Sequence, residues 1–300
     1  MSSDLNRDRL SAVGPAAAAV AHEVVRDRDN PWPGLAPFTE EQSGLFFGRD
    51  QEVRDLTRRA QRNALTVLFG QSGLGKSSLL QAGVFPRLRA DGYWPIYIRL
   101  DHGPRALPPA EQIKLLVQAD TPRAGTWTKP GSAKPAESLW EFFHHRDDRL
   151  VTAAGRTIVP VLVFDQFEEL FTLGAGSGSE RARAVGFMSE LAELVENRPS
   201  EQLVARLEES SAEMEAFDFS RTDYRVVITL REDYLPHLES LTDLPFLPER
   251  NFAGSVGAHL GGETRPRRGW VRRRLTGFFR DNFGAGSGGN TPRISCWAAT

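Results

Sequence analysis

The sequence predicts a three-layer α/β fold, in which helices cover both faces of a parallel β-sheet. Four short runs of apolar and β-branched residues, at 65–69, 93–100, 158–164 and 224–230, alternate with longer segments of helical periodicity. The run at 65–69, which is bounded by Gly70, is typical of a parallel strand that is buried on both faces. The 300 residues are 40% apolar, which is enough for a substantial core.

Helical spacing of apolar residues recurs between these strands. Val53, Leu56 and Ala60, for example, lie three or four residues apart among charged residues just before the first strand. The stretch at 101–136 is rich in Pro, Gly and Thr and is expected to be mostly loop. We expect helices at residues 50–62, 77–88, 111–118, 136–150, 180–197 and 201–217.

The two ends of the chain lack this alternation. Residues 1–30 show no sustained period and are expected to form a disordered leader. A proline-rich arm at 31–38 opens the domain, which we expect to span residues 31–248. Residues 249–300 are rich in Arg, Gly and Ser and are expected to form a disordered tail.

Charge is unevenly divided along the chain. Residues 251–300 hold eight arginines against two acids, a net charge of +6, whereas residues 1–250 carry −8. A basic segment of this kind is a candidate for contact with nucleic acid. It has few aromatic residues near its arginines and no recognisable DNA-reading motif, which disfavours nucleic acid as a partner.

Composition also limits the location. The single cysteine, Cys296, excludes an internal disulfide framework and suits a reducing compartment. No apolar run approaches the roughly 20 residues that a membrane helix needs. We therefore expect a cytoplasmic protein with no membrane partner.

A glycine-rich motif, Gly-x4-Gly-Lys-Ser, joins the first predicted strand to the next helix. In this position the motif predicts a P-loop, whose backbone N–H groups converge on phosphate oxygens beside a helix N-terminus. Lys76 is expected to reach the β- and γ-phosphates, and the Ser77 hydroxyl to bind Mg²⁺. The residues expected to bind the nucleotide here are Gly70, Gln71, Ser72, Gly73, Leu74, Gly75, Lys76, Ser77 and Ser78.

The base of the nucleotide follows from motifs that the sequence lacks. It has no Asn-Lys-x-Asp, the motif that selects guanine, so ATP is favoured over GTP. It also has no Leu-Ser-Gly-Gly signature of the ABC-type transport ATPases, which makes transport a weaker hypothesis.

Acidic residues follow the apolar run at 158–164. Asp165 stands at the carboxyl end of that strand, where P-loop ATPases hold the Mg²⁺ shell, so we expect it to serve the metal. The alternative is an aspartate that only caps the next helix. Glu168 and Glu169 follow within one turn and are candidates for positioning an attacking water, or else form a solvated acidic pair.

Arg231 follows the strand at 224–230. If that strand lies beside the P-loop strand, the guanidinium is placed to sense the γ-phosphate, because arginine binds phosphate bidentately. The alternative is a surface arginine that pairs with Asp233.

Together these motifs resemble the STAND class of P-loop NTPases, and more closely the bacterial novel STAND signalling ATPases. The resemblance covers residues 31–246. Its marks, in chain order, are the arm at 31–38, the run Phe46-Phe47-Gly48-Arg49-Asp50-Gln51-Glu52, the P-loop through Gly83, and the segments 164–171 and 230–235.

The resemblance implies ATP or ADP with Mg²⁺ as ligands, and Gly48 and Arg49 near the adenine and ribose. It implies a sheet of order 5-1-4-3-2, in which the Arg231 strand lies between the strand before the P-loop and the strand before Asp165. It further implies a switch that is closed with ADP and open or homo-oligomeric with ATP, controlled by an effector and a sensor that are not visible here. Gln166 stands where many related ATPases place a catalytic glutamate, so Glu168 is a substitute and hydrolysis is expected to be slow.

Residues 249–300 depart from this family pattern. The resemblance implies a fifth strand and a helical lid after the arginine strand, and these residues match neither. Their composition is what a shifted reading frame of GC-rich DNA would yield. We hypothesise that they are not the family's own continuation, and that the core lacks a lid and binds nucleotide weakly.

Two functions of different classes remain. The first is a regulatory ATPase, whose slow Mg²⁺-dependent hydrolysis controls conformation or assembly. The second is a nucleotide-binding module without significant hydrolysis, whose basic tail grips phosphate backbones of nucleic acid.

Overall fold

The computed structural model describes residues 36–103, 105–127, 137–174, 178–234 and 294–298. The predicted leader at 1–30, the first part of the arm and most of the predicted tail lie outside these residues. Within the described part of the chain, no helix is both long enough and apolar enough to cross a bilayer.

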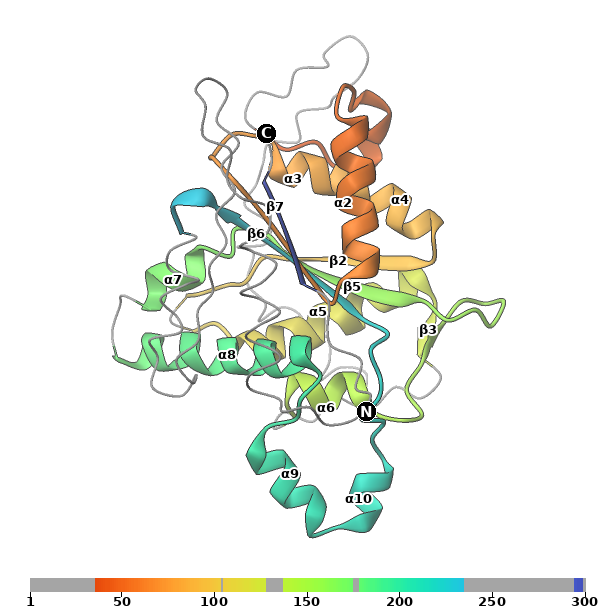
Figure 1. Ribbon diagram of the computed structural model, residues 1–300, viewed down its shortest axis with the longest axis vertical. Coiled ribbons are helices and arrows are strands. Elements are labelled where there is room, and N and C mark those ends of the chain that lie inside the picture. The colour runs from red at the N-terminus through yellow and green to blue at the C-terminus, as the bar shows by residue number, and fades with distance from the viewer. Residues whose placement is uncertain (1–35, 104, 128–136, 175–177, 235–293, 299–300) are drawn as a thin grey trace.

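A five-stranded parallel sheet forms the centre of the molecule (Figure 1). Its strands are β1 (Leu65–Gly70), β2 (Tyr93–Ile98), β5 (Val159–Phe164), β6 (Arg225–Arg231) and β7 (Ile294–Ala298), in the order β2-β5-β6-β1-β7. Read from the β7 edge, these are the fifth, first, fourth, third and second strands of the sheet in chain order. The predicted α/β fold with a parallel sheet is confirmed.

The strand that ends in Arg231 lies between the strand that precedes the glycine-rich loop and the strand that precedes Asp165. β6 pairs with β1 from Leu65↔Val226 to Gly70↔Arg231, and with β5 on its other side. The carboxyl ends of β1, β5 and β6 therefore meet at one edge of the sheet.

β7 corrects the prediction for the tail. The sequence predicts no strand in residues 249–300, yet Ile294–Ala298 pairs with β1, from Leu65↔Ile294 to Phe69↔Ala298. The prediction was wrong for these residues because it judged the segment by its average composition. The run contains isoleucine, cysteine and tryptophan, which favour strands, and the outer edge of β1 offers backbone groups that a fifth strand can satisfy.

Three helical segments cover one face of the sheet, above it in Figure 1. They are α2 (Asp50–Arg62), α3 (Lys76–Ser78) and α4 (Phe85–Ala90), with the π-helix η3 (Leu79–Val84) between the last two. The helix predicted at 77–88 is thus present, but its middle part, η3, is a π-helix, which is wider than an α-helix. Pro86 lacks an N–H and clashes with the carbonyl four residues earlier in a regular α-helix, and a π-turn relieves that clash.

Gly83 allows η3 to lie close to α2. A methyl group at this glycine would stand 2.5 Å from Cγ2 of Val53. Leu56, Leu80 and Leu88 pack around the same contact in the core of this face.

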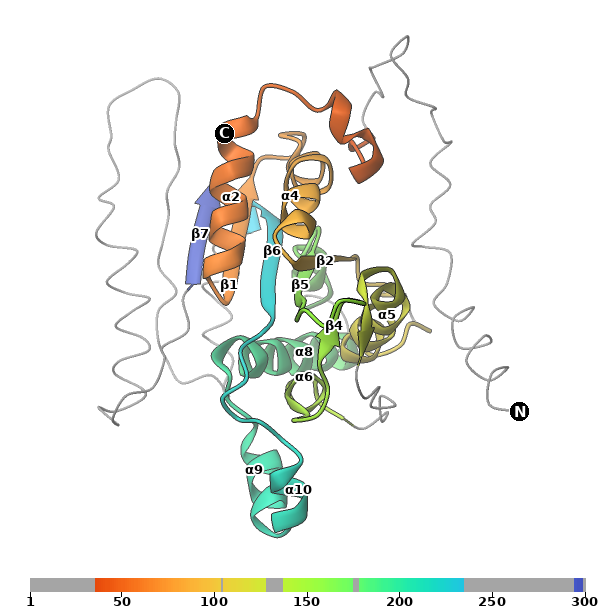
Figure 2. The same ribbon diagram turned by 90° about the vertical axis from the view of Figure 1, so that its right-hand side faces the viewer.

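The opposite face of the sheet carries the larger core. It is covered by α5 (Pro109–Ala124), α6 (Leu139–His144), α7 (Glu169–Gly174) and α8 (Gly178–Glu196). Two short helices, α9 (Glu201–Glu208) and α10 (Ser211–Glu215), project away from this layer (Figures 1 and 2). The remaining short elements are η2 (Glu40–Leu45), η4 (Glu232–Tyr234), β3 (Thr126–Trp127) and β4 (Leu150–Val151).

Two predicted helices were too long and one was too short. The helix predicted at 136–150 ends at His144, because the backbone of Arg146 instead donates to the Ala216 carbonyl at 2.8 Å. The helix predicted at 201–217 is two helices, and Ser210 caps the second by accepting from the Glu213 N–H. The helix predicted at 111–118 extends over Pro109–Ala124.

A candidate phosphate and metal site at the edge of the sheet

The glycine-rich loop between β1 and α3 has the backbone that its sequence predicts. Gly73 and Gly75 have φ of 84° and 74°, in the left-handed region that favours glycine. The N–H of Leu79 donates to the Gly75 carbonyl at 2.8 Å, so the helix begins directly after the loop. Gln71, Ser72 and the two glycines are exposed, and the loop is open to a ligand.

Lys76 folds back over this loop. Its Nζ donates to the carbonyls of Gly70 at 2.9 Å and Gln71 at 3.0 Å. Burial lowers its pKa, and the charges of Glu168 and Asp165 partly oppose that shift. An ammonium has three donors, so these two contacts leave one for a ligand.

Ser77 and Asp165 are brought together from distant parts of the sequence. The Ser77 hydroxyl donates to Oδ2 of Asp165 at 2.6 Å, and the carboxylate is only 5% exposed. A hydroxyl that donates its proton keeps its lone pairs for a metal. One hydroxyl oxygen and one carboxylate are hard oxygen ligands, so this pair fits Mg²⁺.

Two further hydroxyls hold the same carboxylate. Tyr97 of β2 donates to Oδ2 of Asp165 at 2.6 Å, and Thr229 of β6 donates to Oδ1. Burial and the Asp165 charge raise the pKa of Tyr97, so its hydroxyl keeps its proton. The sequence analysis missed both residues, although each is a polar residue near the carboxyl end of an apolar strand.

The chain turns sharply after Asp165. Gln166 has φ of 57°, an uncommon value for a residue other than glycine, and its N–H donates to Oδ1 of Asp165 at 3.1 Å. The N–H of Phe167 donates to the Thr229 carbonyl at 2.9 Å. This turn places Glu168 back toward the glycine-rich loop.

The structure separates the two glutamates that the sequence left as alternatives. Among the described residues, Oε2 of Glu168 is buried without a hydrogen-bond partner, and burial raises the pKa of this carboxyl. Hydrogen bonds to this carboxyl from the backbone N–H groups of Glu168 and Arg231, and the Lys76 charge, partly oppose that shift. Glu169 instead forms an ion pair with Arg99 at 3.0 Å, and both of these side chains are exposed.

Arg231 lies beside the loop but is engaged elsewhere. Its backbone is in register with Gly70, so its strand lies beside the strand that precedes the loop, as the family resemblance implies. Its guanidinium forms a two-point contact with Asp233, at 3.1 Å from Nε and 2.6 Å from a terminal nitrogen. This is the pairing that the sequence analysis left open.

The segment around Gly48 and Arg49 also reaches the loop. Gly48 has φ of 82°, and a guanidinium nitrogen of Arg49 donates to the Leu74 carbonyl at 3.5 Å. Ser78 contacts the arm rather than the loop, since its hydroxyl accepts from the Phe38 N–H at 3.0 Å. Phe47, next to Gly48, is 78% exposed.

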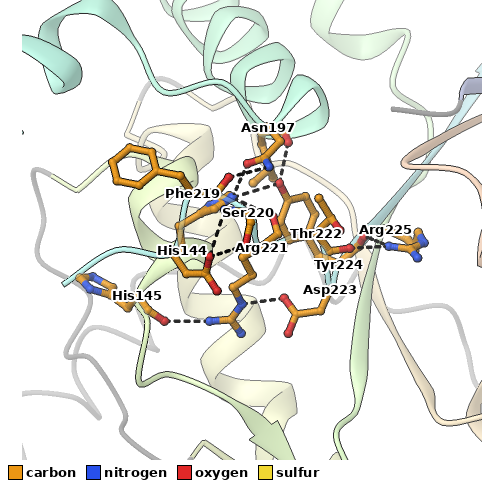
Figure 3. Close-up of polar contacts among 12 residues, drawn as sticks. His144, His145, Asn197, Phe219, Ser220, Arg221, Thr222, Asp223, Tyr224 and Arg225 are labelled. Atoms are coloured by element: carbon orange, nitrogen blue, oxygen red, sulfur yellow. Dashed lines mark hydrogen bonds and ion pairs between the residues drawn. The ribbon is translucent and has the colours of Figure 1, made fainter. Parts of the chain in front are cut away.

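A second polar cluster lies at the other end of β6 (Figure 3). We call His144, Asn197, Arg221 and Tyr224 the His144 cluster. The imidazole is fully buried, 2.6 Å from the Trp140 carbonyl through Nδ1 and 2.6 Å from Oδ1 of Asn197 through Nε2. The contact with Asn197 links α6 to the residue after α8, and Nε2 also lies 3.1 Å from the carbonyl of Arg221, in the segment before β6, so the cluster is structural.

Other bonds of the cluster run between the same elements. Tyr224 donates to the Leu194 carbonyl at 2.8 Å, and Arg221 donates to the His145 carbonyl at 2.9 Å. Burial lowers the pKa of His144, and its hydrogen bonds to Trp140 and Asn197 partly oppose that shift.

Comparison with known proteins identifies a family, and partial likenesses that include the following two. The family model described as Novel STAND NTPase 1 matches residues 31–252. The phosphate import ATP-binding protein PstB 2 of Bacillus licheniformis is 34% identical over 68 residues, which are 20% of this chain and 23% of the relative. A Walker-type ATPase of Pyrococcus abyssi is 19% identical with a TM-score of 0.41, over 74% of this chain and 55% of that chain. The chain therefore spans less than two thirds of either protein.

Proposed function

The chain belongs to the Novel STAND NTPase 1 family of nucleotide-binding proteins, and from that premise we propose a switch that binds ATP with Mg²⁺ and hydrolyses it slowly. In this proposal the nucleotide state controls conformation or assembly, in the cytoplasm. A homo-oligomer in the ATP state and an unidentified effector or sensor protein are part of the same proposal.

The contact between Ser77 and Asp165 carries the proposal. These residues are 88 positions apart in the sequence, and the fold brings the hydroxyl within 2.6 Å of the carboxylate beside the glycine-rich loop. Magnesium, when bound, would neutralise charge that develops on the phosphates during transfer. Ser77 and Asp165 would hold it through oxygen atoms.

Lys76 and the loop backbone would bind the phosphates. The ammonium already lies over the loop, where it contacts two carbonyls that a phosphate oxygen would replace as the stronger, charged acceptor. The glycines at positive φ leave the loop N–H groups free of side-chain obstruction. Arg49, tied to the Leu74 carbonyl, would lie near the ribose and adenine together with Gly48.

Glu168 is the candidate for positioning the attacking water. Its buried Oε2 can accept a hydrogen bond from water, and a raised pKa brings the carboxyl nearer to neutral pH, where a base is more effective. Glu169 is a weaker candidate because it is held by Arg99. Gln166 is neutral and cannot accept a proton, which supports slow turnover.

Arg231 would report the γ-phosphate. Its guanidinium is bound to Asp233, which presents two oxygens much as a phosphate does. A γ-phosphate on the loop would compete with Asp233 for the guanidinium, and ADP would not. This exchange is the proposed difference between the two nucleotide states.

Gln166 also favours a second candidate, a binding module without significant hydrolysis. Single-turnover assays with excess protein over ATP would separate the two, because slow turnover is visible there within minutes to hours. Sedimentation with ADP and with a non-hydrolysable ATP analogue would test assembly. We expect turnover that requires Mg²⁺, and a protein that sediments as a larger particle with the analogue than with ADP. Binding without turnover would leave the second candidate.

A further inference from the structure

Tyr97 contacts Asp165 although it belongs neither to the glycine-rich motif nor to the segment around Asp165. It lies on β2, paired with Val163 of β5, and its hydroxyl reaches across to Asp165 at 2.6 Å. Oδ2 of Asp165, the oxygen that Tyr97 contacts, is also the one that accepts from Ser77. Tyr97 therefore donates directly to the pair that fits a metal.

Packing alone does not require this hydroxyl. The ring of Tyr97 meets Phe85 edge-on, with centroids 6.5 Å apart, and a phenylalanine would make the same contact. The hydroxyl adds two polar links, one to Asp165 and one from the side chain of Gln81 on the helix that follows the P-loop. Tyr97 thus connects that helix to the carboxylate.

The carboxylate is held from both neighbouring strands. β2 and β6 flank β5 in the sheet, and each supplies one hydroxyl, from Tyr97 to Oδ2 and from Thr229 to Oδ1. Asp165 is only 5% exposed, and a buried carboxylate needs such donors to satisfy its oxygens and to keep one orientation. Groups that orient a metal-binding side chain in this way typically change metal affinity 10–100-fold when they are removed.

We propose that Tyr97 is a positioning residue, which aims the Asp165 carboxylate at Ser77 and so sets the Mg²⁺ dependence of nucleotide binding. The inference rests on the proposed function, since it concerns the same site. Tyr97 acts through Asp165 and touches neither the nucleotide nor the reacting atoms.

The test compares nucleotide affinity with and without the metal. A fluorescent ATP analogue is titrated with excess Mg²⁺ and again with EDTA, for the wild type and for Tyr97→Phe. In EDTA, we expect the variant to bind the analogue as tightly as the wild type does. The increase in affinity that Mg²⁺ produces should be about 10-fold smaller in the variant. Thr229→Val, which removes the hydroxyl on the other side, should change affinity in the same direction.

Tyr93→Phe is the matched control. Tyr93 lies on the same strand, four residues away and on the same side of the strand, so its variant removes a phenol hydroxyl without touching Asp165. It should keep the wild-type gain from Mg²⁺. A thermal unfolding curve for each variant shows whether the fold is intact.

The outcomes are distinct. A wild-type gain from Mg²⁺ in Tyr97→Phe would overturn the inference and leave the proposed function in place, even if that variant unfolded at a lower temperature. An equal loss in Tyr93→Phe would also overturn it. A wild-type protein that binds the analogue equally well in Mg²⁺ and EDTA would contradict the proposed metal site itself, and this inference with it.

Discussion

The two ends of β6 use polar groups in different ways. At the Arg231 end, Oε2 of Glu168 is buried without a partner among the described residues, and Lys76 donates to two carbonyls of the loop, which leaves one of its three N–H donors for a ligand. At the Tyr224 end, the buried His144 ring contacts the Trp140 carbonyl of its own helix, and Oδ1 of Asn197 and the Arg221 carbonyl on neighbouring segments. Buried polar groups are costly unless they are bonded, so unused bonding capacity beside an exposed glycine loop indicates a ligand site. Polar groups that bond to other segments of the chain instead hold those segments together, and we call such a cluster a structural joint.

The largest expected effect is a loss of stability from a substitution in the His144 cluster, at the Tyr224 end of β6. His144→Ala removes a fully buried ring together with its contacts to the Trp140 carbonyl and to Oδ1 of Asn197. We expect the free energy of unfolding to fall by about 3 kcal/mol, measured by urea denaturation. ATP affinity of the folded protein should not change. A fall below about 1 kcal/mol would show that the His144 cluster is not a structural joint.

The next effect sharpens the choice between the two glutamates. Glu168→Gln should slow single-turnover hydrolysis about 100-fold while ATP stays bound, because a water-positioning carboxylate acts mainly in the transition state. Glu169→Gln is the matched control and should keep the wild-type rate, since Glu169 pairs with Arg99 at the surface. A loss from the control alone would reverse the assignment.

A pH effect should follow from burial of His144. Its pKa is lowered in the folded state, so the unfolded chain binds more protons as pH falls below about 6.5. The stability from this group is present above that pH and is lost as pH falls, by at most about 1.4 kcal/mol per pH unit. Urea unfolding at pH 8, 7, 6 and 5 should show this slope, and it should be smaller in His144→Gln.

The variant is needed because another group acts with the opposite sign. Burial, with the Glu190 charge, raises the pKa of Glu193 to about 7, so its contribution is lost as pH rises through 7. The difference between wild type and His144→Gln isolates the histidine. Equal slopes in the two proteins would remove His144 from the explanation.

The smallest expected effect concerns Arg231. Its ion pair with Asp233 is exposed, and exposed pairs contribute little. Asp233→Asn should therefore raise the preference for ATP over ADP by only about two- to fivefold, by freeing the guanidinium for the γ-phosphate. Competitive titration of the two nucleotides measures the ratio. A lower preference for ATP would contradict the proposed exchange.

The sequence predicted the parts of the fold that depend on local pattern. The strands β1, β2, β5 and β6 consist mainly of apolar and β-branched residues, and the glycine-rich loop follows from glycine's freedom at positive φ. Helix ends were predicted less well, because contacts between distant segments decide them. Arg146, for example, bonds to Ala216 instead of continuing α6.

The sequence names the motif residues of the candidate site but not the residues that support them. Lys76, Ser77 and Asp165 are recognisable from spacing alone, and the structure brings the last two together. Tyr97 and Thr229 come from two other strands, and only the order of the sheet places them beside the carboxylate. β7 escaped prediction because a short strand gives a weak pattern and depends on the edge of β1 for its partner.

The most direct test of the central claim is calorimetric titration of ATP with Mg²⁺ into the wild type and Lys76→Ala. We expect the variant to lose about one to two powers of ten in affinity, because a charge-assisted contact to phosphate is removed. The midpoint of its unfolding curve should be no lower than that of the wild type. Wild-type affinity in Lys76→Ala would contradict the claim that this loop is the nucleotide site.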